Sequence, residues 1–453
     1  MVTHLFSRSA GNHKPLRGLE SGSRVAVIGG GPAGSFFSYF LLELAERVGI
    51  DLKVDIYEPR DFSLPAPQGC NMCAGVISET LVQNLATEGI NLPSSIVQKG
   101  ISSYVLHTDS GSQRIDAVNQ EKRIGAIFRG AGPHGIREMR YEGFDQHLLS
   151  LAEKKGANVI RMRVTGVERT GDRMQVRTHS NPAAGYDLLA VAAGVNTTVL
   201  KLFEQEAPKY RPPQAAKTAI REYYLGKQAV EKYFGDSLHV FLLDIPGLDF
   251  AMIVPKGDFV SVSLLGKQID DRLLQDFLTA PEVKSCFPEG WRWDQPGCQC
   301  LPRINVRAAI QPYADRVVFI GDSGVSRLYK DGIGSAYRAA KAAASCAILE
   351  GISSEDFRRH YAPFYKTMEA DNRIGRVIFS VTYIIQHFHF FRKAVLRMVA
   401  AEQRSPGGSA RLSSVLWDTF TGSASYREVF LRTLHPAFTS HFVWGLITSV
   451  LGV

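Results

Sequence analysis

The patterned part of the chain begins with a short apolar strand, a glycine-rich turn and a long apolar helix. Residues 24–28 form an apolar run of strand length, and residues 35–48 carry apolar side chains at helical spacing. A second strand-like run covers residues 52–58. This order of strand, glycine-rich turn, helix and strand predicts the mononucleotide-binding unit of a parallel sheet.

Later apolar runs extend this sheet and predict a second one. Residues 186–193 and 316–321 have the composition of buried strands, whereas residues 218–265 alternate strand-like segments around Pro/Gly turns, which is typical of an antiparallel sheet. The predicted fold class is therefore α/β, with a Rossmann-like domain and an α+β substrate domain. The predicted division is a mobile leader (1–23), a discontinuous nucleotide-binding domain with inserted strands (24–210 and 301–351), an antiparallel-sheet substrate domain (211–300) and a helical C-terminal region (352–453).

The turn Gly29-Gly30-Gly31-Pro32-Ala33-Gly34 has the spacing of a dinucleotide-binding site. Gly29 permits the sharp turn, Gly31 lets the backbone approach a pyrophosphate, and Gly34 allows close packing of the helix on the strand. Glu58 ends the second strand, where its carboxylate can accept hydrogen bonds from ribose hydroxyls. Together these residues predict a bound dinucleotide.

A second glycine-rich region, 319–324 followed by 332–336, resembles the second flavin-binding segment of FAD-dependent enzymes of the p-hydroxybenzoate hydroxylase fold. The resemblance implies that Gly321 and Asp322 lie at the ribityl chain. It also implies that a helix starting at Gly332-Ile333-Gly334 points at the flavin ring and pyrophosphate. The expected cofactor is therefore FAD.

Three further segments are similar to the geranylgeranyl reductase family. They are Cys73-Ala74-Gly75, Arg140 with the following Phe144-Asp145, and the stretch 246–258; the likeness spans roughly residues 24–351. The resemblance implies that Arg140 helps to bind the cofactor. It also implies a substrate site formed by Phe250, Met252, Val254, Pro255 and Tyr329.

The same resemblance implies reduction of C=C bonds in a polyprenyl chain, which needs a hydride for one carbon and a proton for the other. Cys73 is the candidate proton donor. Cys70 and Cys73 also form a Cys-x-x-Cys pair, which is compatible with a redox dithiol or with half of a metal site completed by Cys298 and Cys300. The preferred interpretation assigns no metal ligands.

Charge and apolar patterning point to a membrane surface. The net charge is +8, and residues 373–453 hold nine Lys/Arg against three acids. The apolar stretches 377–388 and 441–453 are too short to span a bilayer but suit its interface beside these cations. Alternatively, they pack as core helices or form a dimer interface. Nucleic-acid binding is not expected, since the basic residues are interleaved with apolar ones.

The sequence therefore predicts an FAD-dependent oxidoreductase that acts on an apolar lipid or quinone. Six cysteines in 453 residues and a polar N-terminal stretch indicate a cytoplasmic protein, peripheral at the inner face of the membrane. The electron donor (NADPH, ferredoxin or quinone) and the oligomeric state stay open. The alternatives are a quinone-linked dehydrogenase, an FAD-dependent monooxygenase and a non-catalytic flavin-binding scaffold or sensor.

Overall fold

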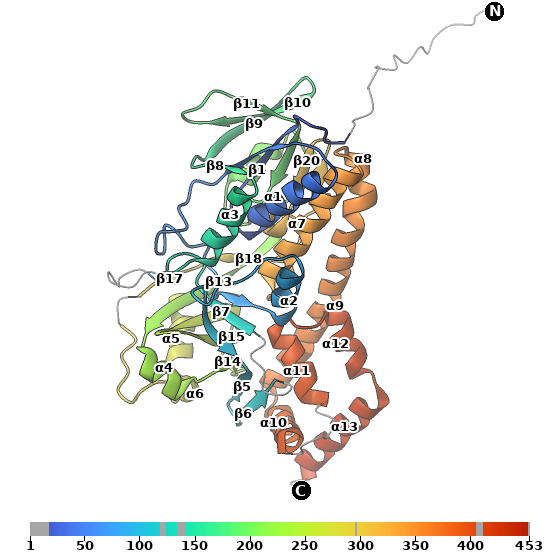
Figure 1. Cartoon of the computed structure of the whole chain (residues 1–453). Coiled ribbons are helices and arrows are strands. Elements are labelled where there is room, and N and C mark those ends of the chain that lie inside the picture. Colours follow the sequence, from blue (N-terminus) through green and yellow to red (C-terminus); the bar gives the residue numbers. More distant parts are fainter. Residues whose placement is uncertain (1–17, 118–123, 134–140, 295–296, 405–410, 452–453) are drawn as a thin grey trace, which may run out of the picture.

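The computed structural model describes residues 18–117, 124–133, 141–294, 297–404 and 411–451 (Figure 1). Its first sheet has six strands, all parallel except the edge strand β19. Their order is β19 (Tyr313–Ala314), β20 (Val317–Phe319), β12 (Leu188–Val191), β1 (Arg24–Ile28), β2 (Lys53–Tyr57) and β8 (Asn158–Ile160). The sequence prediction of a Rossmann-like parallel sheet is confirmed.

The strands of this sheet are apolar on both faces; helices cover one face, and Met174, Val176 and Tyr186 of a small neighbouring sheet share a core with the other. Helix α1 (Pro32–Arg47) follows β1 directly, and α7 (Gly332–Leu349) packs along it; α3 (Phe144–Lys154) lies on the other side of α1. A short 3-10 turn, η3 (Gly321–Ser323), leads from β20 towards α7. The sheet and these helices share one apolar core.

The second sheet has eight strands, mostly antiparallel. Along the sheet these are β17 (Gln299–Cys300), β13 (Gln214–Tyr224), β16 (Phe259–Gly266), β15 (Leu248–Lys256), β14 (Ser237–Phe241), β5 (Ser103–Thr108) and β6 (Gly111–Asp116), while β18 (Arg303–Arg307) also pairs with β13. Strands β5 and β6 come from within 24–210, so this range contributes to both sheets. The β14–β5 pairing is parallel, which joins the two contributions.

The two faces of this sheet are covered differently. One face packs with α4 (Lys227–Tyr233), α5 (Asp271–Thr279) and α6 (Pro281–Lys284) around one apolar core. The other carries Leu238, Phe250 and Leu265, which share a core with Val395 and Trp417 of the C-terminal helices.

Two further sheets have three strands each. One consists of β9 (Val164–Thr170), β10 (Arg173–Thr178) and β11 (Ala184–Tyr186), and the other of β3 (Val76–Ile77), β7 (Ile124–Ile127) and β4 (Val97–Ile101). Helix α2 (Glu79–Thr87) and the 3-10 turn η2 (Val199–Phe203) lie in the connections.

The C-terminal region is helical, as predicted. Its elements are α8 (Ser354–Asp356), the π-helical turn η4 (Phe357–Tyr361), α9 (Ala362–His387), α10 (His389–Arg404), α11 (Arg411–Thr421), α12 (Tyr426–Thr433) and α13 (Pro436–Leu451). The long α9 runs from the Rossmann-like domain down to the other helices of this region (Figure 1). Within the described parts of the chain, no helix combines the length and hydropathy needed to cross a membrane.

The leader predicted over 1–23 divides into two parts. Residues 1–17 lie outside the described residues. Residues 18–23 contact the domain: Leu19 is buried, and the Gly22 N–H donates a hydrogen bond of 2.7 Å to the Asp51 carbonyl.

The close packing of α1 on the turn that precedes it makes a testable prediction. A Cβ atom at Gly34 would lie 1.8 Å from the carbonyl oxygen of Gly29, a backbone atom that cannot move aside cheaply. Overpacking of this kind costs about 1–3 kcal/mol, so Gly34→Ala should lower the melting temperature measurably. Gly166→Ala is the control, because its Cβ would meet Arg177 at an ordinary 3.5 Å. Equal melting temperatures for the two variants would contradict this account.

Candidate functional site

A cavity of about 1230 Å³ lies between the two sheets. Ile28, Tyr57 and Ala192, at the carboxyl ends of three parallel strands, line one part of it. Ligands of open α/β sheets bind at this edge. Ile220 and Met252 of the second sheet line another part. One cavity therefore joins the predicted nucleotide site to the predicted substrate domain.

Two helix N-termini open into this cavity. Pro32 and Ala33 of α1 line it, and so do Gly332 and Ile333 of α7. No side chain caps either helix at its first residues. Because a helix N-terminus carries partial positive charge and free N–H groups, the pair suits a pyrophosphate anion.

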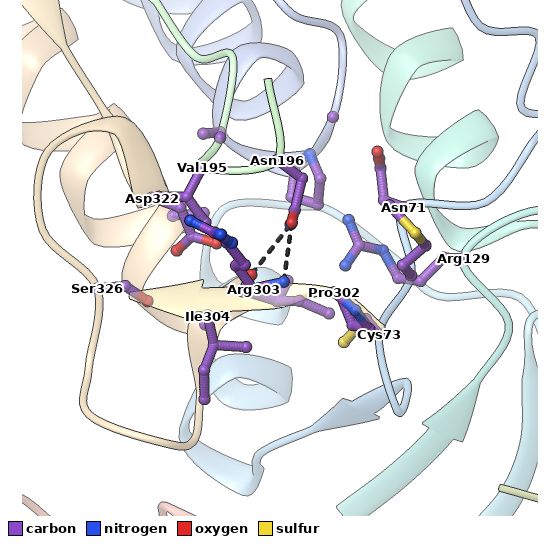
Figure 2. A pocket seen from close by; sticks show the side chains of 18 of the residues that line it. Asn71, Cys73, Arg129, Val195, Asn196, Pro302, Arg303, Ile304, Asp322 and Ser326 are labelled. Atoms are coloured by element: carbon purple, nitrogen blue, oxygen red, sulfur yellow. Dashed lines mark hydrogen bonds between the residues drawn. The ribbon is translucent and has the colours of Figure 1, made fainter. Parts of the chain in front are cut away.

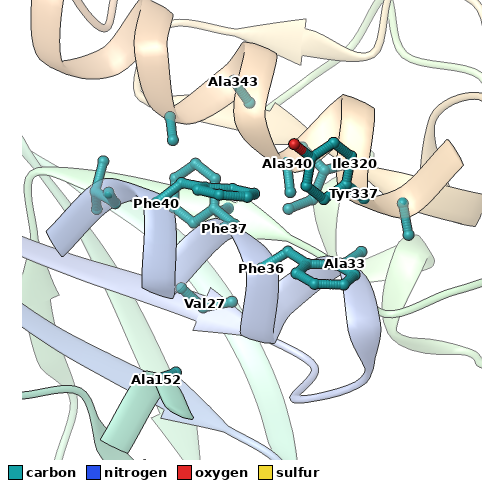
Figure 3. Packing of buried hydrophobic residues seen from close by; sticks show 14 of the residues in the cluster. Val27, Ala33, Phe36, Phe37, Phe40, Ala152, Ile320, Tyr337, Ala340 and Ala343 are labelled. Atoms are coloured by element: carbon teal, nitrogen blue, oxygen red, sulfur yellow. The ribbon is translucent and has the colours of Figure 1, made fainter. Parts of the chain in front are cut away.

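The two helices are held together by aromatic and small side chains (Figure 3). The ring of Tyr337 meets Phe36 and Phe40 edge-on, at centroid distances of 5.5 and 5.3 Å. Ala340 and Ala343 let α7 approach α1 closely. This packing places both N-termini at one cavity.

Several predicted glycines serve the packing around the ligand site. Gly29 has a φ of +108°, and a Cβ there would lie 2.5 Å from the Ala192 carbonyl oxygen. A Cβ on Gly321 would lie 2.6 Å from that of Ala33, so the two predicted flavin segments are in contact. Gly29 and Gly31 line the cavity, whereas Gly34, Gly321 and Gly334 lie beside it.

Two acids face the cavity, as the sequence predicted. The Glu58 carboxylate accepts hydrogen bonds from the N–H groups of Gly30 (2.8 Å) and Arg60 (2.9 Å). Burial raises the pKa of Glu58. Burial also raises the pKa of Asp322, although a hydrogen bond with Ser326 acts in the opposite direction. Both acids line the cavity and can accept bonds from the hydroxyls of a nucleotide.

The sequence reasoning missed a buried polar network at the cavity wall. Arg129 forms a two-pronged ion pair with Asp145, at 2.6 and 2.9 Å, and Asn71 donates to the same carboxylate. Asn71 also accepts a bond from Arg60. Arg140, which was predicted to bind the cofactor, lies outside the described residues. In the sequence, Asp145 was the residue that could have indicated this network, because a buried carboxylate requires a cationic partner.

A second missed residue, Asn196, fixes the loop that follows β12. Its side chain exchanges two hydrogen bonds with the backbone of Arg303, at 3.0 and 2.8 Å (Figure 2). Both residues line the cavity. The contact ties the cofactor-binding sheet to β18 and thus to the second sheet.

The remainder of the cavity is largely apolar. Of the predicted substrate residues, Met252 and Tyr329 line it. Phe250 and Val254 are buried but are not among the lining residues, and strand alternation places Pro255 on the opposite face. The apolar lining that the sequence did not reveal comes from Ile220, Leu238, Leu265 and Phe420.

The segment Tyr329-Lys330-Asp331 connects this cavity to the C-terminal helices. Tyr329 and Asp331 have positive φ angles of 62° and 52°. The Lys330 ammonium between them donates to the carbonyls of Asp418, at 2.7 Å, and Thr419, which end α11. Burial lowers the pKa of Lys330, and the two carbonyls take the place of water as acceptors for its N–H groups.

Cys73, the predicted proton donor, lines the cavity. Its sulfur accepts a 3.4 Å hydrogen bond from the Gly75 N–H. Cys70, Cys298 and Cys300 join Cys73 around a small adjoining cavity. Burial raises the pKa of Cys70 to about 11 and that of Cys300 to about 12, which keeps both as thiols at neutral pH.

Comparison with known proteins places the fold. No family model matches the chain. It is 23% identical to a digeranylgeranylglycerophospholipid reductase of Methanococcus vannielii over 393 aligned residues, covering 78% of this chain and 83% of that protein. A flavoprotein/dehydrogenase of Cytophaga hutchinsonii aligns over 94% of this chain and 99% of its own, with a TM-score of 0.60 and 14% identity.

Two halogenases have a similar structure. The flavin-dependent halogenase CmlS matches 91% of this chain and 76% of its own, with a TM-score of 0.60 and 17% identity. The halogenase PltM, in complex with phloroglucinol and FAD, matches 95% and 92%, with a TM-score of 0.59 and 12% identity. The fold is thus that of FAD-binding flavoproteins, and the resemblance to geranylgeranyl reductases is supported by the sequence relative. Together with the cavity, these likenesses support an FAD-dependent oxidoreductase.

Glu58 provides a test of the cofactor site. In Glu58→Gln an N–H₂ group replaces one acceptor oxygen, and a hydrogen bond to a charged group contributes about 1.5–3 kcal/mol. FAD affinity should fall at least about tenfold, as measured by flavin fluorescence titration. Because burial raises the pKa of Glu58, the affinity of the unaltered chain should also fall as acidification protonates it, and the variant should show less of this pH dependence.

The control is Glu88→Gln. Glu88 also accepts hydrogen bonds, from Tyr337 and Lys341, but does not line the cavity. Equal affinity losses in the two variants would count against a ribose-binding role for Glu58.

Proposed function

We propose that this chain, which has the fold of FAD-binding flavoproteins and a sequence similar to a digeranylgeranylglycerophospholipid reductase, binds FAD and reduces C=C bonds of a polyprenyl lipid. The observation that carries the proposal is the continuity of the cavity, which joins two helix N-termini and two acids to an apolar wall. Its 1230 Å³ exceeds the roughly 300–1,000 Å³ of ordinary ligand pockets, which leaves room for a second ligand beside a dinucleotide.

The residues present fit FAD. Uncapped N-termini at Gly31 and Asp331 suit the pyrophosphate, and Glu58 and Asp322 offer acceptors to the ribose and ribityl hydroxyls. Positive φ angles and close neighbours, the Ala192 carbonyl at Gly29 and the Ala33 side chain at Gly321, require glycine at both positions. When bound, FAD supplies hydride transfer.

The chain's own residues supply the rest of the reaction. Leu238, Met252 and Leu265 exclude water from one wall and can hold an isoprenoid chain by apolar contact. Cys73, on the wall between the nucleotide site and the small cysteine-lined cavity, holds a proton at Sγ for the second carbon of the double bond. The proposal requires an electron donor that reduces the flavin. It does not choose among NADPH, ferredoxin and quinone.

A second part of the proposal concerns the membrane surface. Val377, Val381, Ile384 and Phe388 recur every three or four residues along α9 and its end, and each is 45–53% exposed. Apolar side chains at this spacing share one helix face. On α13, Trp444 is 66% exposed beside Val443 and Ile447. Exposed apolar stripes in a region rich in Lys and Arg suit a peripheral position on an anionic bilayer, from which a lipid substrate enters.

The reaction is tested with the purified flavoprotein under anaerobic conditions. After chemical reduction, a geranylgeranyl lipid should reoxidise the flavin and be recovered with added hydrogen by mass spectrometry. Reoxidation by a quinone alone would instead indicate a quinone-linked dehydrogenase. A need for oxygen with an aromatic substrate would indicate a monooxygenase, and a flavin that nothing reoxidises would indicate a scaffold or sensor.

Cys73→Ala should leave FAD bound but slow lipid reduction by about 10²–10⁴-fold, the usual contribution of a positioned proton donor. Cys346→Ala is the matched control, because Cys346 is buried in α7 away from the cavity. Single-turnover absorbance of the flavin measures the step. Unchanged turnover in Cys73→Ala would remove this cysteine from the reaction.

Membrane binding is tested with the double variant Trp444→Ser/Ile447→Ser. Since a buried large apolar side chain contributes about 1.5–3 kcal/mol, its affinity for vesicles of phosphatidylcholine and phosphatidylglycerol should fall at least about tenfold in co-sedimentation. Ile310→Ser removes an equally exposed side chain, at 64%, outside the C-terminal helices. Equal losses for both variants, or none for either, would argue against α13 as the contact.

A further inference from the structure

Three ligand-type side chains meet inside the second sheet, away from the large cavity. His107 lies in β5, one residue before its end, His239 lies on the neighbouring β14, and Cys286 follows α6. His107 Nε2 lies 2.9 Å from His239 Nδ1, and Cys286 Sγ lies 3.8 and 3.5 Å from these two nitrogens. All three residues are buried.

These spacings approach those around a single tetrahedral zinc ion. Bond lengths of about 2.05 Å to nitrogen and 2.3 Å to sulfur place tetrahedral ligands roughly 3.3 Å (N to N) and 3.5 Å (N to S) apart. The 3.5 Å between Cys286 Sγ and His239 Nδ1 already matches, whereas the 3.8 Å from Sγ to His107 Nε2 needs to close and the 2.9 Å between the nitrogens needs to open, each by a few tenths of an ångström. A mixed imidazole and thiolate donor set suits zinc.

The surroundings orient the two imidazoles as ligands. The hydroxyl of Ser112 lies 2.7 Å from His107 Nδ1, so a donated Nδ1–H leaves the Nε2 lone pair facing the group. Metal-bound histidines characteristically form such an outer hydrogen bond. The ring of Phe241 stacks on His107 at 4.5 Å, and Phe234 meets His239 edge-on at 4.9 Å, which makes the pocket dry.

The protonation of the three groups in the metal-free chain is consistent with this role. Burial lowers the pKa of His107 to about 4 and that of His239 to about 3, so both imidazoles are neutral at physiological pH and keep a lone pair. Burial raises the pKa of Cys286 to about 12, so its sulfur carries a proton that a metal would displace. Binding would therefore release one proton for each ion.

We propose that His107, His239 and Cys286 bind one Zn²⁺ ion as a structural site, with the fourth position taken by the carbonyl of Glu282, which lies 3.3 Å from Cys286 Sγ. The Zn–S bond forms as the S–H proton leaves to solvent, with no change of oxidation state. The ion would join β5, which comes from the first half of the chain, to β14 and the segment after α6. It would thus tie the two contributions to the second sheet together.

The test is the zinc content of the full-length flavoprotein expressed with added zinc, measured by atomic mass spectrometry. We expect about one zinc per chain, lost in both Cys286→Ser and His239→Gln. Cys346→Ser is the matched control, since burial also raises the pKa of Cys346 to about 12, and it should keep the ion. Retained FAD in each variant shows that it has folded.

Cobalt titration of the chelator-treated protein gives an independent readout. Bound Co²⁺ should show the charge-transfer absorption of a thiolate ligand, absent from Cys286→Ser and present in Cys346→Ser. Absence of zinc from the unaltered protein together with no cobalt absorption would overturn the proposal and leave a hydrogen-bonded trio. Zinc that persists in Cys286→Ser but is lost from Cys70→Ser or Cys298→Ser would also overturn it, because the metal would then lie at the four-cysteine cavity.

Discussion

The packing of α7 on α1 is the interaction on which the functional site depends. The two helices start almost 300 residues apart in the chain, and their N-termini meet at one cavity only because their flanks interlock. Tyr337 fills the space against Phe36 and Phe40, while alanines along α7 keep the axes close. A pyrophosphate anion bound there, as proposed, would meet two partial positive charges, which one helix alone would not provide.

The C-terminal helices depend on the same loop that begins α7. Lys330 and Arg327 donate to carbonyls at and just after the end of α11, at Asp418, Thr419, Gly422 and Ala424. Cations at a helix C-terminus satisfy carbonyls that have no partner within the helix. The apolar wall that includes Phe420 is therefore attached to the loop that begins α7. A substrate entering along these helices would then be positioned relative to the flavin.

Local patterns predicted the parallel sheet and the glycine turns because each depends on neighbouring residues. Glu58 was predictable for the same reason, since strand β2 ends there. The network of Arg129, Asn71 and Asp145 was not predictable, because its members come from two loops and the first turn of α3 and meet only after folding. The same applies to His107 and Cys286, 179 positions apart, which no spacing rule connects. Strands β5 and β6 were assigned to the first domain because sequence order does not reveal which sheet a strand joins.

The likeness to halogenases and to a lipid reductase shows that this fold hosts different reactions, so the side chains at the apolar wall must decide between them. Three ionisable groups that line the cavity can carry a proton: Lys330, Tyr329 and Cys73. Burial lowers the pKa of Lys330, which disfavours its protonated form, and burial raises the pKa of Tyr329, which makes its phenol a weaker donor. Cys73 remains, and the charge left on its sulfur would be balanced by Arg129, with which it interacts electrostatically. This arrangement favours delivery of a proton, the step that saturation of a double bond requires.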